Sequence, residues 1–377
     1  MRGATTSAAD AVAVIGVGSS TIERHSDRGI HAFALDAAIS AIADAGLERD
    51  DIDGYVGAPG ATNAGALHVD GGDEITARTL VESLGITDLA FSVDAYKGFP
   101  TDMAIVAAQA LRGGCCKYVL GVRALYNLSG VDYATAAPEH AYGLDQFRLP
   151  FGASAAGARF ATRAQAYLHR SGATRRDLYE VVALARRHAR LNPLAIWRER
   201  AVTLDEYLAA PMVASPLGRF DCDIPVCGAA AFVMTLGNNI PAGTNAPVYL
   251  AGDAGWQQVR NIFERSRRAR EDIDCCQIYD GFSSMMFEWL ERLGWCEADT
   301  GWKFIRNGHA ERDGRLPLNT FGGSLGEGRL HGMGHLREAV LQVRGRAGAR
   351  QLPKVDNCLV QVGTFDFSSL LILSATP

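Results

Sequence analysis

The chain has 377 residues, of which 48% are hydrophobic and 21% are charged, a composition typical of a globular protein large enough for two fused sub-domains. Its net charge of −5 provides no basic surplus, so we expect no nucleic-acid partner. Apolar runs such as 104–110 are far shorter than a membrane span, and the first residues include no apolar signal segment, so the sequence predicts a cytoplasmic protein with no membrane association.

The first part of the chain alternates apolar strand-like runs with helical patterns, as an α/β fold does. The residues at 102–111 are almost all small or apolar, so we expect a helix that is buried on all sides, with Thr101 as its N-cap. In chain order we predict strand 11–17, helix 30–45, helix 79–84, strand 90–94, a turn at 96–100, helix 102–111 and strand 117–122.

The region from about 125 to 214 is richer in charged, aromatic and helix-forming residues, and it predicts a helical insertion that covers one side of the core. We therefore divide the chain into an N-terminal half at 1–245, which contains this insertion, and a C-terminal half at 246–377. The remaining predicted elements are a buried strand or a helix–strand junction at 226–236, strand 247–251, strand 277–279, helix 282–293, helix 333–345 and strands within 357–373.

A weak internal repeat links the two halves. Ala-Ala-Gln-Ala-Leu-Arg-Gly at 107–113 precedes an apolar strand, and Ala-Val-Leu-Gln-Val-Arg-Gly at 339–345 precedes another. A duplicated α/β half would produce this repetition, although helix ends also resemble one another by chance.

The cysteines and glycines indicate no cofactor. No Cys-x-x-Cys pair is present among the eight cysteines, and buried reduced thiols are the better interpretation of Cys222 and Cys227, with a metal or redox pair as the alternative. Gly16-x-Gly18 lacks the third glycine of a dinucleotide-binding loop. We therefore expect no bound cofactor and no metal.

The most informative stretch is the glycine-rich loop at 319–335, which carries two histidines and runs into the helix at 333–345. Glycines allow tight turns and close approach of a ligand, so titratable groups on such a loop indicate a reaction site. His331 and His335 are four residues apart and would share one face of a helix, as zinc ligands can, but no third ligand is evident. Helix packing is the alternative role of His335.

Several motifs, in this order, resemble the thiolase superfamily over nearly the whole chain, in the branch of non-specific lipid-transfer proteins and sterol-carrier-protein-x. They are Ala-Asp-Ala-Gly-Leu at 43–47, Asp-Ile-Asp-Gly at 51–54, Ala-Ala-Gln-Ala at 107–110, Asn-Pro at 192–193, Tyr-Asp-Gly-Phe at 279–282, Leu-Glu-Arg-Leu-Gly at 290–294, Leu-Pro-Leu-Asn-Thr at 316–320 and the closing loop. The resemblance implies a five-layered αβαβα thiolase fold of two pseudo-duplicated halves, each with a five-stranded sheet. It also implies a homodimer and acyl-CoA substrates, with coenzyme A entering only as part of the substrate.

The chain departs from this family at all three groups that carry thiolase chemistry. The family places its nucleophilic cysteine just before the helix at 102–111, where the turn at 96–100 offers no thiol. Arg329 stands in the place of the catalytic histidine, and 361–363 lacks the second cysteine. Cys115 and Cys116 lie past the far end of a helix roughly 15 Å long and cannot substitute. We therefore expect no cysteine-linked acyl intermediate.

A subset of the family lacks the same groups and resembles this chain in the Tyr-Asp-x-Phe motif and the closing loop. Its members are retro-aldolases of steroid side-chain degradation that cleave a β-hydroxyacyl-CoA and work with a small OB-fold zinc-ribbon subunit. This resemblance implies the same reaction and the same kind of partner here. Tyr279, in the shared motif, suits the role of base or proton relay. Arg329 stands where the subset has a second tyrosine, and this is a departure: a guanidinium cannot act as a base, but it can stabilise an oxyanion.

The candidate catalytic residues are therefore Tyr279, His331 and Arg329. The candidate substrate-binding residues are Lys97, Gly322, Gly323 and His335. Two alternative functions stay open: a thiolase-type acyltransferase that cleaves a β-ketoacyl-CoA with coenzyme A, and a non-catalytic acyl-CoA-binding subunit of a hetero-oligomer.

Three further residues or groups have two interpretations each. Tyr279 is either catalytic or a buried tyrosine at a strand end. Asp280 either orients Tyr279 or, as we favour, caps the helix that follows. The arginine pairs at 175–176 and 186–187 either form a solvated helix face, as we favour, or grip the phosphates of coenzyme A.

Overall fold

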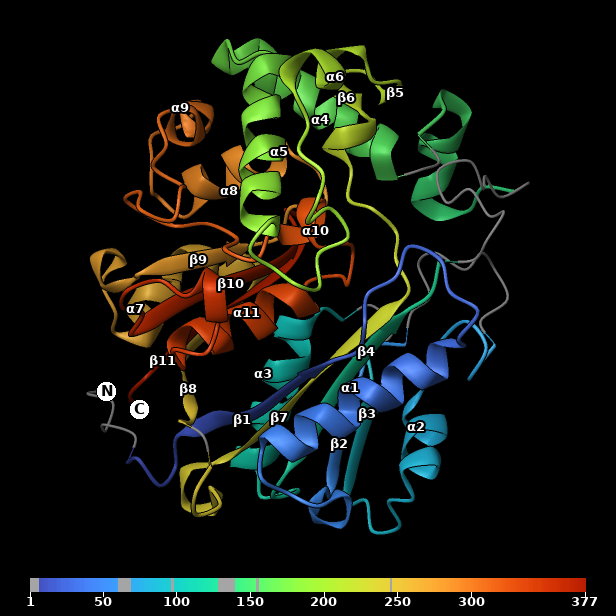
Figure 1. Cartoon of the computed structure of the whole chain (residues 1–377), viewed down its shortest axis with the longest axis vertical. Coiled ribbons are helices and arrows are strands. Elements are labelled where there is room, and N and C mark those ends of the chain that lie inside the picture. Colours follow the sequence, from blue (N-terminus) through green and yellow to red (C-terminus); the bar gives the residue numbers. More distant parts are fainter. Residues whose placement is uncertain (1–6, 60–68, 96–97, 128–139, 154–155, 245) are drawn as a thin grey trace.

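The computed structural model describes residues 7–59, 69–95, 98–127, 140–153, 156–244 and 246–377 (Figure 1). Lys97, one of the candidate substrate-binding residues, lies outside these ranges. Within them, no helix combines the length and the apolar character needed to cross a membrane.

The predicted helices and strands occur in the predicted order, together with elements that we did not predict, among them a strand at 54–57 and helices at 262–266, 301–306 and 323–326. The first half contains β1 (Val12–Ser19), α1 (Ile30–Asp44), β2 (Gly54–Gly57), α2 (Ala77–Leu84), β3 (Phe91–Asp94), α3 (Pro100–Arg112), β4 (Val119–Leu125), α4 (Ala156–Ser171), α5 (Arg175–Ala189), α6 (Leu204–Ala209), β5 (Met212–Ala214), β6 (Leu217–Gly218) and β7 (Gly228–Leu236). The second half contains β8 (Val248–Gly255), α7 (Ile262–Ser266), β9 (Cys275–Ile278), α8 (Met285–Arg292), α9 (Gly301–Arg306), α10 (Gly323–Gly326), α11 (Met333–Val343), β10 (Asn357–Thr364) and β11 (Phe367–Ser374).

The strands of the two halves repeat one pairing scheme. The hydrogen-bonded order is β3-β2-β4-β7-β1-β8-β11-β10-β9. β2 pairs parallel with β4 as β9 does with β10, and the antiparallel series β4-β7-β1 matches β10-β11-β8. β1 and β8 join the halves through only two residue pairs. In the place of β3 the second half has only an isolated parallel bridge between Leu318 and Cys276 of β9, and no further strand among the described residues. Our expectation of five strands in each half is therefore wrong by one strand.

The helices complete the five-layered αβαβα fold (Figure 1). α3 precedes β4 as α11 precedes β10, which confirms the internal repeat, and both helices contact strands of both halves. α1 packs closely on β1 because Gly16 and Gly18 have no side chains. A Cβ added at Gly16 would lie 2.2 Å from the Ala41 carbonyl oxygen, and one at Gly18 would lie 2.4 Å from that of Ala37. The Gly-x-Gly pair therefore permits close packing of α1 on β1.

The N-terminus of α3 differs from the prediction. Thr101 does not cap the helix, which begins at Pro100 with Phe99 as the N-cap residue. The reason is that proline suits the first helical position, since it has no N–H to satisfy there. The Phe99 N–H donates to Asp102 at 2.9 Å, and the Thr101 hydroxyl lies 2.6 Å from that of Ser369 on β11.

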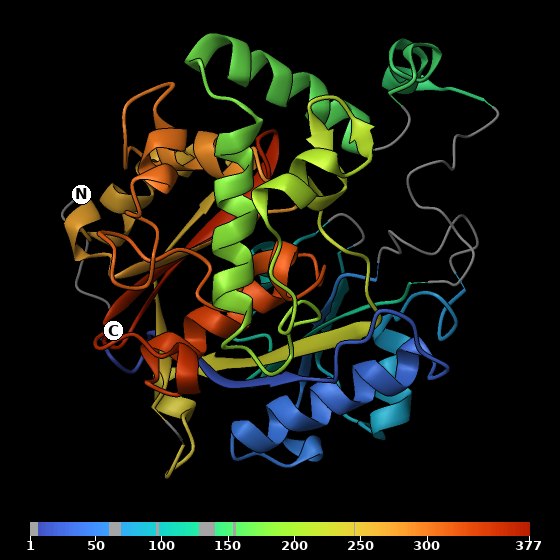
Figure 2. The ribbon, with the colours of Figure 1, turned by 45° about the horizontal axis from the view of Figure 1, so that its top comes forward.

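Between β4 and β7 the described residues form α4, α5 and α6, and α5 packs on α10 (Figure 2). Asn192, just after α5, donates to the Phe321 carbonyl at 3.0 Å and to Glu327 at 2.8 Å. This segment therefore holds the glycine-rich loop against the core. Our domain boundary at 245/246 and the insertion limits of 125 and 214 remain predictions.

Candidate active site

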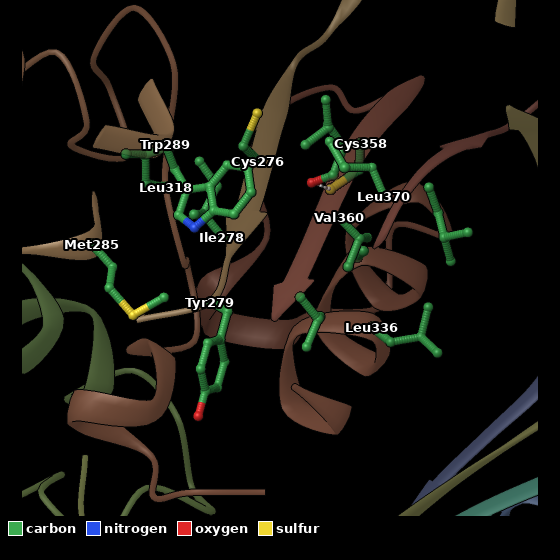
Figure 3. Close-up of a cluster of buried hydrophobic side chains, with 14 of the residues drawn as sticks. Cys276, Ile278, Tyr279, Met285, Trp289, Leu318, Leu336, Cys358, Val360 and Leu370 are labelled. Carbon is green, nitrogen blue, oxygen red and sulfur yellow. Dashed lines mark hydrogen bonds between the residues drawn. The ribbon is translucent and has the colours of Figure 1, made fainter. Parts of the chain in front are cut away.

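Tyr279 directly follows β9 and lies at the edge of the apolar core. Figure 3 shows its hydroxyl pointing away from the cluster that contains Ile278, Trp289 and Leu318. The ring is 8% exposed, and its centroid lies 6.3 Å from that of Phe99. Because the backbone N–H donates to the Gln361 carbonyl at 3.0 Å, the adjacent strand fixes the position from which the phenol projects.

The Tyr279 hydroxyl donates a hydrogen bond of 3.2 Å to Asp223, a buried residue that our sequence reasoning missed. Asp223 also lies 3.7 Å from a terminal nitrogen of Arg329. Backbone bonds fix this geometry, since the Asp223 N–H donates to the Gly281 carbonyl at 3.0 Å and the Arg329 N–H donates to the Ile224 carbonyl at 2.9 Å. Three separate chain segments thus place a phenol, a carboxylate and a guanidinium together.

Burial raises the pKa of Asp223 to about 6. The Arg329 cation and the Tyr279 hydrogen bond oppose this rise in the pKa, whereas the negative charge of Asp280 adds to it. A carboxyl group that titrates near the working pH can both accept and return a proton, as a general base must.

His331 lies beside a second buried cation that the sequence reasoning missed, Arg123 on β4. One terminal nitrogen of Arg123 lies 2.9 Å from His331 Nδ1, and the other donates to the Gly98 carbonyl at 2.7 Å. A guanidinium can only donate, so Nδ1 accepts and the proton of the neutral ring belongs on Nε2. The signal in the sequence was an arginine inside an apolar strand, because such residues are almost never buried unpaired.

We expect His331 to be neutral at neutral pH and to stay neutral as the pH falls through the ordinary histidine pKa of about 6.5. Burial, with Arg123 and Arg329 adding repulsion, lowers the pKa of its ring well below the ordinary value. Nitrogen-15 NMR of histidine-labelled protein, assigned by comparison with His331→Gln, should show one ring with a constant Nε2–H signal. Titration of the His331 ring near its ordinary pKa, or a proton on Nδ1, would contradict this geometry.

The Asp280 carboxylate bonds the backbone of the glycine-rich loop and lies beside the ring of His335. The Asp280 carboxylate accepts from the backbone N–H groups of Ser324 at 2.7 Å and Leu325 at 3.3 Å, and it lies 3.1 Å from His335 Nε2. Asp280 therefore bonds the N-terminal end of α10. Our favoured interpretation, that Asp280 caps the helix that follows it in the chain, is wrong, because the N-cap residue of that helix, α8, is Ser284. The buried His335 ring lies 5.9 Å from the Tyr279 ring, and its role in binding substrate stays a prediction.

Gly322 and Gly323 both have positive φ angles, of 101° and 63°. A Cβ added at Gly323 would lie 2.0 Å from an Asp280 carboxylate oxygen, and one at Gly322 would lie 2.8 Å from the Ala189 Cβ. These glycines therefore let the loop approach both Asp280 and α5, and direct contact with substrate stays a prediction.

A cavity of about 400 Å³ opens beside Asp223, the partner of Tyr279 and Arg329, and Asp223 forms part of its wall. Of the two arginine pairs considered in the sequence, Arg186 alone lines this cavity. Arg187 pairs with Glu311, and Arg175 donates to backbone carbonyls near the end of α6. The described lining residues are Arg24, Asn127, Arg186, Trp197, Arg200, Val213, Arg219, Phe220, Cys222, Asp223, Ile224 and Pro225.

Two of the thiols, those of Cys358 and Cys222, are poorly suited to nucleophilic chemistry. Cys358 is buried with its sulfur 3.4 Å from that of Cys275, on a different side of the apolar cluster from the Tyr279 hydroxyl (Figure 3). Cys222 lines the cavity, but burial, together with Asp223 and Asp221, raises the pKa of its thiol far above the ordinary value. A protonated thiol is a weak nucleophile and a weak metal ligand. Within the described ranges, no three His, Cys, Asp or Glu residues cluster as a metal site requires.

Comparison with known proteins identifies clear relatives. Residues 250–375 match the family described as Thiolase C-terminal domain-like. The chain is 31% identical to the steroid side-chain-cleaving aldolase of Thermomonospora curvata, over 97% of this chain and 98% of that protein. It is also 31% identical to the 17-hydroxy-3-oxo-4-pregnene-20-carboxyl-CoA lyase of Mycobacterium tuberculosis, over 96% of this chain and 98% of that protein.

Solved structures agree with these relatives. The Ltp2-ChsH2(DUF35) aldolase superposes with a TM-score of 0.87 at 29% identity, covering 97% of this chain and 98% of that one. Human mitochondrial 3-ketoacyl-CoA thiolase superposes with a TM-score of 0.68 at 12% identity, covering 98% of this chain and 100% of that one. The second likeness concerns the fold alone.

Proposed function

The chain belongs to the thiolase superfamily, in its sterol-carrier-protein branch near the steroid side-chain-cleaving aldolases, and on this premise we propose that it is an acyl-CoA carbon–carbon lyase. The reaction is the retro-aldol cleavage of a β-hydroxyacyl-CoA to a carbonyl compound and a shorter acyl-CoA. The observation that carries this proposal is the buried Tyr279–Asp223 hydrogen bond beside Arg329. A thiolase would need a thiolate at the N-terminus of α3, and the described part of that turn contains none.

Each step has a residue suited to it. Asp223 accepts the phenolic proton while the Tyr279 oxygen takes the proton of the β-hydroxyl group. The bond between the α and β carbons then breaks, the β-carbon becomes a carbonyl, and the electron pair forms the enolate of the shorter thioester. Return of a proton from the Tyr279–Asp223 pair to the α-carbon completes the balance.

The enolate oxygen requires hydrogen-bond donors. Arg329 and the Nε2–H of His331 are the donors that we assign to it. Arg329 lies 3.7 Å from Asp223, the partner of Tyr279, and its charge also acts on the buried His331 ring. Neither group competes for the proton. Arg123 fixes the His331 tautomer, so it is a positioning residue for this donor.

Product analysis tests the proposal. With a β-hydroxyacyl-CoA, we expect equal amounts of the carbonyl product and the shorter acyl-CoA, with no consumption of free coenzyme A. Replacing Cys115, Cys116 and Cys358 together by serine should leave turnover largely unchanged. An acyl-cysteine adduct, or consumption of coenzyme A with a β-ketoacyl-CoA, would establish an acyltransferase instead. Binding of both thioesters without turnover, even with the partner present, would indicate a non-catalytic subunit.

We further propose a cytoplasmic homodimer that binds a small OB-fold zinc-ribbon protein. Two features support an assembly: β3 is an edge strand of the described sheet, and Tyr142, Leu144, Phe147 and Phe151 are highly exposed. Light scattering should give twice the chain mass for the protein alone and a larger mass after co-expression with such a partner. A fully active monomer would contradict the proposed assembly.

A further inference from the structure

We call Tyr279, Asp223, Arg329 and His331 the reaction cluster. The cavity beside it, which Asp223 lines, carries an excess of positive charge. Among its described lining residues, four are arginines and one, Asp223, is acidic. That carboxylate already accepts from Tyr279 and lies 3.7 Å from Arg329, so it does not neutralise the four arginines. Arg200 has a weak partner in Glu206 at 3.5 Å, on the exposed surface.

Among these arginines, Arg186 is the clearest case of a positive charge with no negative charge beside it in the described part of the chain. Its side chain projects from α5, is 4% exposed, and stacks 4.1 Å above the ring of Trp197. Nε and one terminal nitrogen have no hydrogen-bond partner among the described residues. Burial, with repulsion from Arg200, lowers the pKa of Arg186 to about 9. A buried guanidinium without a counter-ion is destabilising, so we expect that it is retained for an anion that arrives from outside.

The positive charge extends from Arg186 to the reacting groups. The Arg24 guanidinium donates to the Pro225 carbonyl, and burial, followed by Arg219 and Arg329, lowers its pKa. Arg24 therefore lies close enough to be repelled both by Arg219, which lines the cavity, and by Arg329, which lies beside Asp223.

We propose that this cavity, which we call the arginine cavity, binds an oxyanion carried by the substrate, a carboxylate or a phosphate, through Arg186, Arg200 and Arg219. Guanidinium groups suit this chemistry because their planar N–H fork matches the oxygens of a carboxylate or phosphate. The inference rests on the proposed function, since it takes the substrate to be an acyl-CoA that reacts at Tyr279.

The position of the cavity favours a carboxylate on the acyl group. The phosphates of coenzyme A are separated from the thioester by the pantetheine arm, roughly 15 Å of extended chain. The arginine cavity starts at Asp223, which bonds Tyr279, and a sphere of its volume is only roughly 9 Å across. An acidic acyl chain would reach Arg186 from the reaction cluster more directly than a nucleotide phosphate would.

Binding of thioesters that cannot react tests this proposal separately from the lyase activity. Succinyl-CoA and butyryl-CoA are similar in size and lack a β-hydroxyl group, so neither can undergo the retro-aldol step. By calorimetry we expect succinyl-CoA to bind about tenfold tighter than butyryl-CoA, the scale of one good charged contact. Arg186→Gln should remove the difference, and Arg190→Gln, at an exposed position just past the end of α5, should retain it.

The dephospho forms of both thioesters identify the source of the oxyanion. If the cavity holds the 3′-phosphate, the two acyl groups bind equally, the dephospho forms bind more weakly, and Arg186→Gln removes that phosphate effect. Either pattern supports an oxyanion site. Equal affinities of the wild type and Arg186→Gln for all four thioesters would overturn it.

A measurement of thermal stability distinguishes loss of the binding contact from loss of the folded structure. Because Arg186 is buried without a hydrogen-bonded counter-ion, Arg186→Gln should melt at the same temperature as the wild type or higher. Arg219→Gln, at an exposed position on the cavity rim, supplies a second variant with the same expected loss of discrimination. These results stand whether or not the lyase reaction is observed.

Discussion

Replacing Tyr279 by phenylalanine is expected to lower turnover of a β-hydroxyacyl-CoA by ~100-fold or more, the scale of a lost general base. The variant loses the hydroxyl that donates to Asp223 at 3.2 Å, and with it the path by which the proton leaves the substrate. The ring keeps its packing near Phe99 and His335, so the fold should be preserved.

Steady-state kinetics at saturating substrate, together with thermal unfolding, measures both effects. Tyr118→Phe is the matched control, because its hydroxyl likewise donates a hydrogen bond, of 2.7 Å to the Asn239 carbonyl. We expect wild-type turnover from that control. A loss of less than about tenfold in Tyr279→Phe would remove the phenol from the proton path.

Replacing Asp223 by asparagine should cost a similar factor, on the order of 100-fold or more, and should change the pH profile. Asp223 must be ionised to accept the phenolic proton, and burial raises its pKa to about 6. Activity of the wild type should therefore fall as the pH drops through 6 and reach a plateau above that value. Asparagine cannot take up the proton, so this acid limb should disappear in the variant.

The pH dependence of kcat/KM for the free enzyme is the measurement that isolates this group. Asp221→Asn serves as the control, since Asp221 is buried only two residues away, burial also raises its pKa, and its carboxylate accepts from Tyr207 and Ser283. That variant should keep the acid limb. An unchanged acid limb in Asp223→Asn would assign the ionisation to another group.

The sequence by itself determined the elements whose signals are local. The small apolar residues of α3, the alternation of strands and helices, and the repeated helix–strand unit at α3–β4 and α11–β10 all depend on neighbours within a few residues. The glycine-rich loop and Tyr279 were recognised in the same way, because their motifs are continuous in the chain.

The local patterns gave wrong predictions where the same residues were compatible with two different hydrogen-bonding arrangements. Thr101 is a good capping residue, but Pro100 before it already starts the helix. Asp280 precedes one helix in the chain, yet its carboxylate bonds the N-terminal end of another, α10, because the loop at 322–326 folds over it. The number of strands in the second half likewise followed from the family resemblance and not from the residues.

The tertiary structure alone decided how the reaction cluster is assembled. Asp223 is 56 residues from Tyr279, and Arg123 is 208 residues from His331, so no periodicity connects either pair. Their protonation also depends on burial by the whole fold, which removes water and raises the pKa of Asp223 while lowering that of His331. The sequence supplied the candidate side chains, and the packing of distant segments set their charges, because desolvation and Coulomb interactions depend on distance in space and not along the chain.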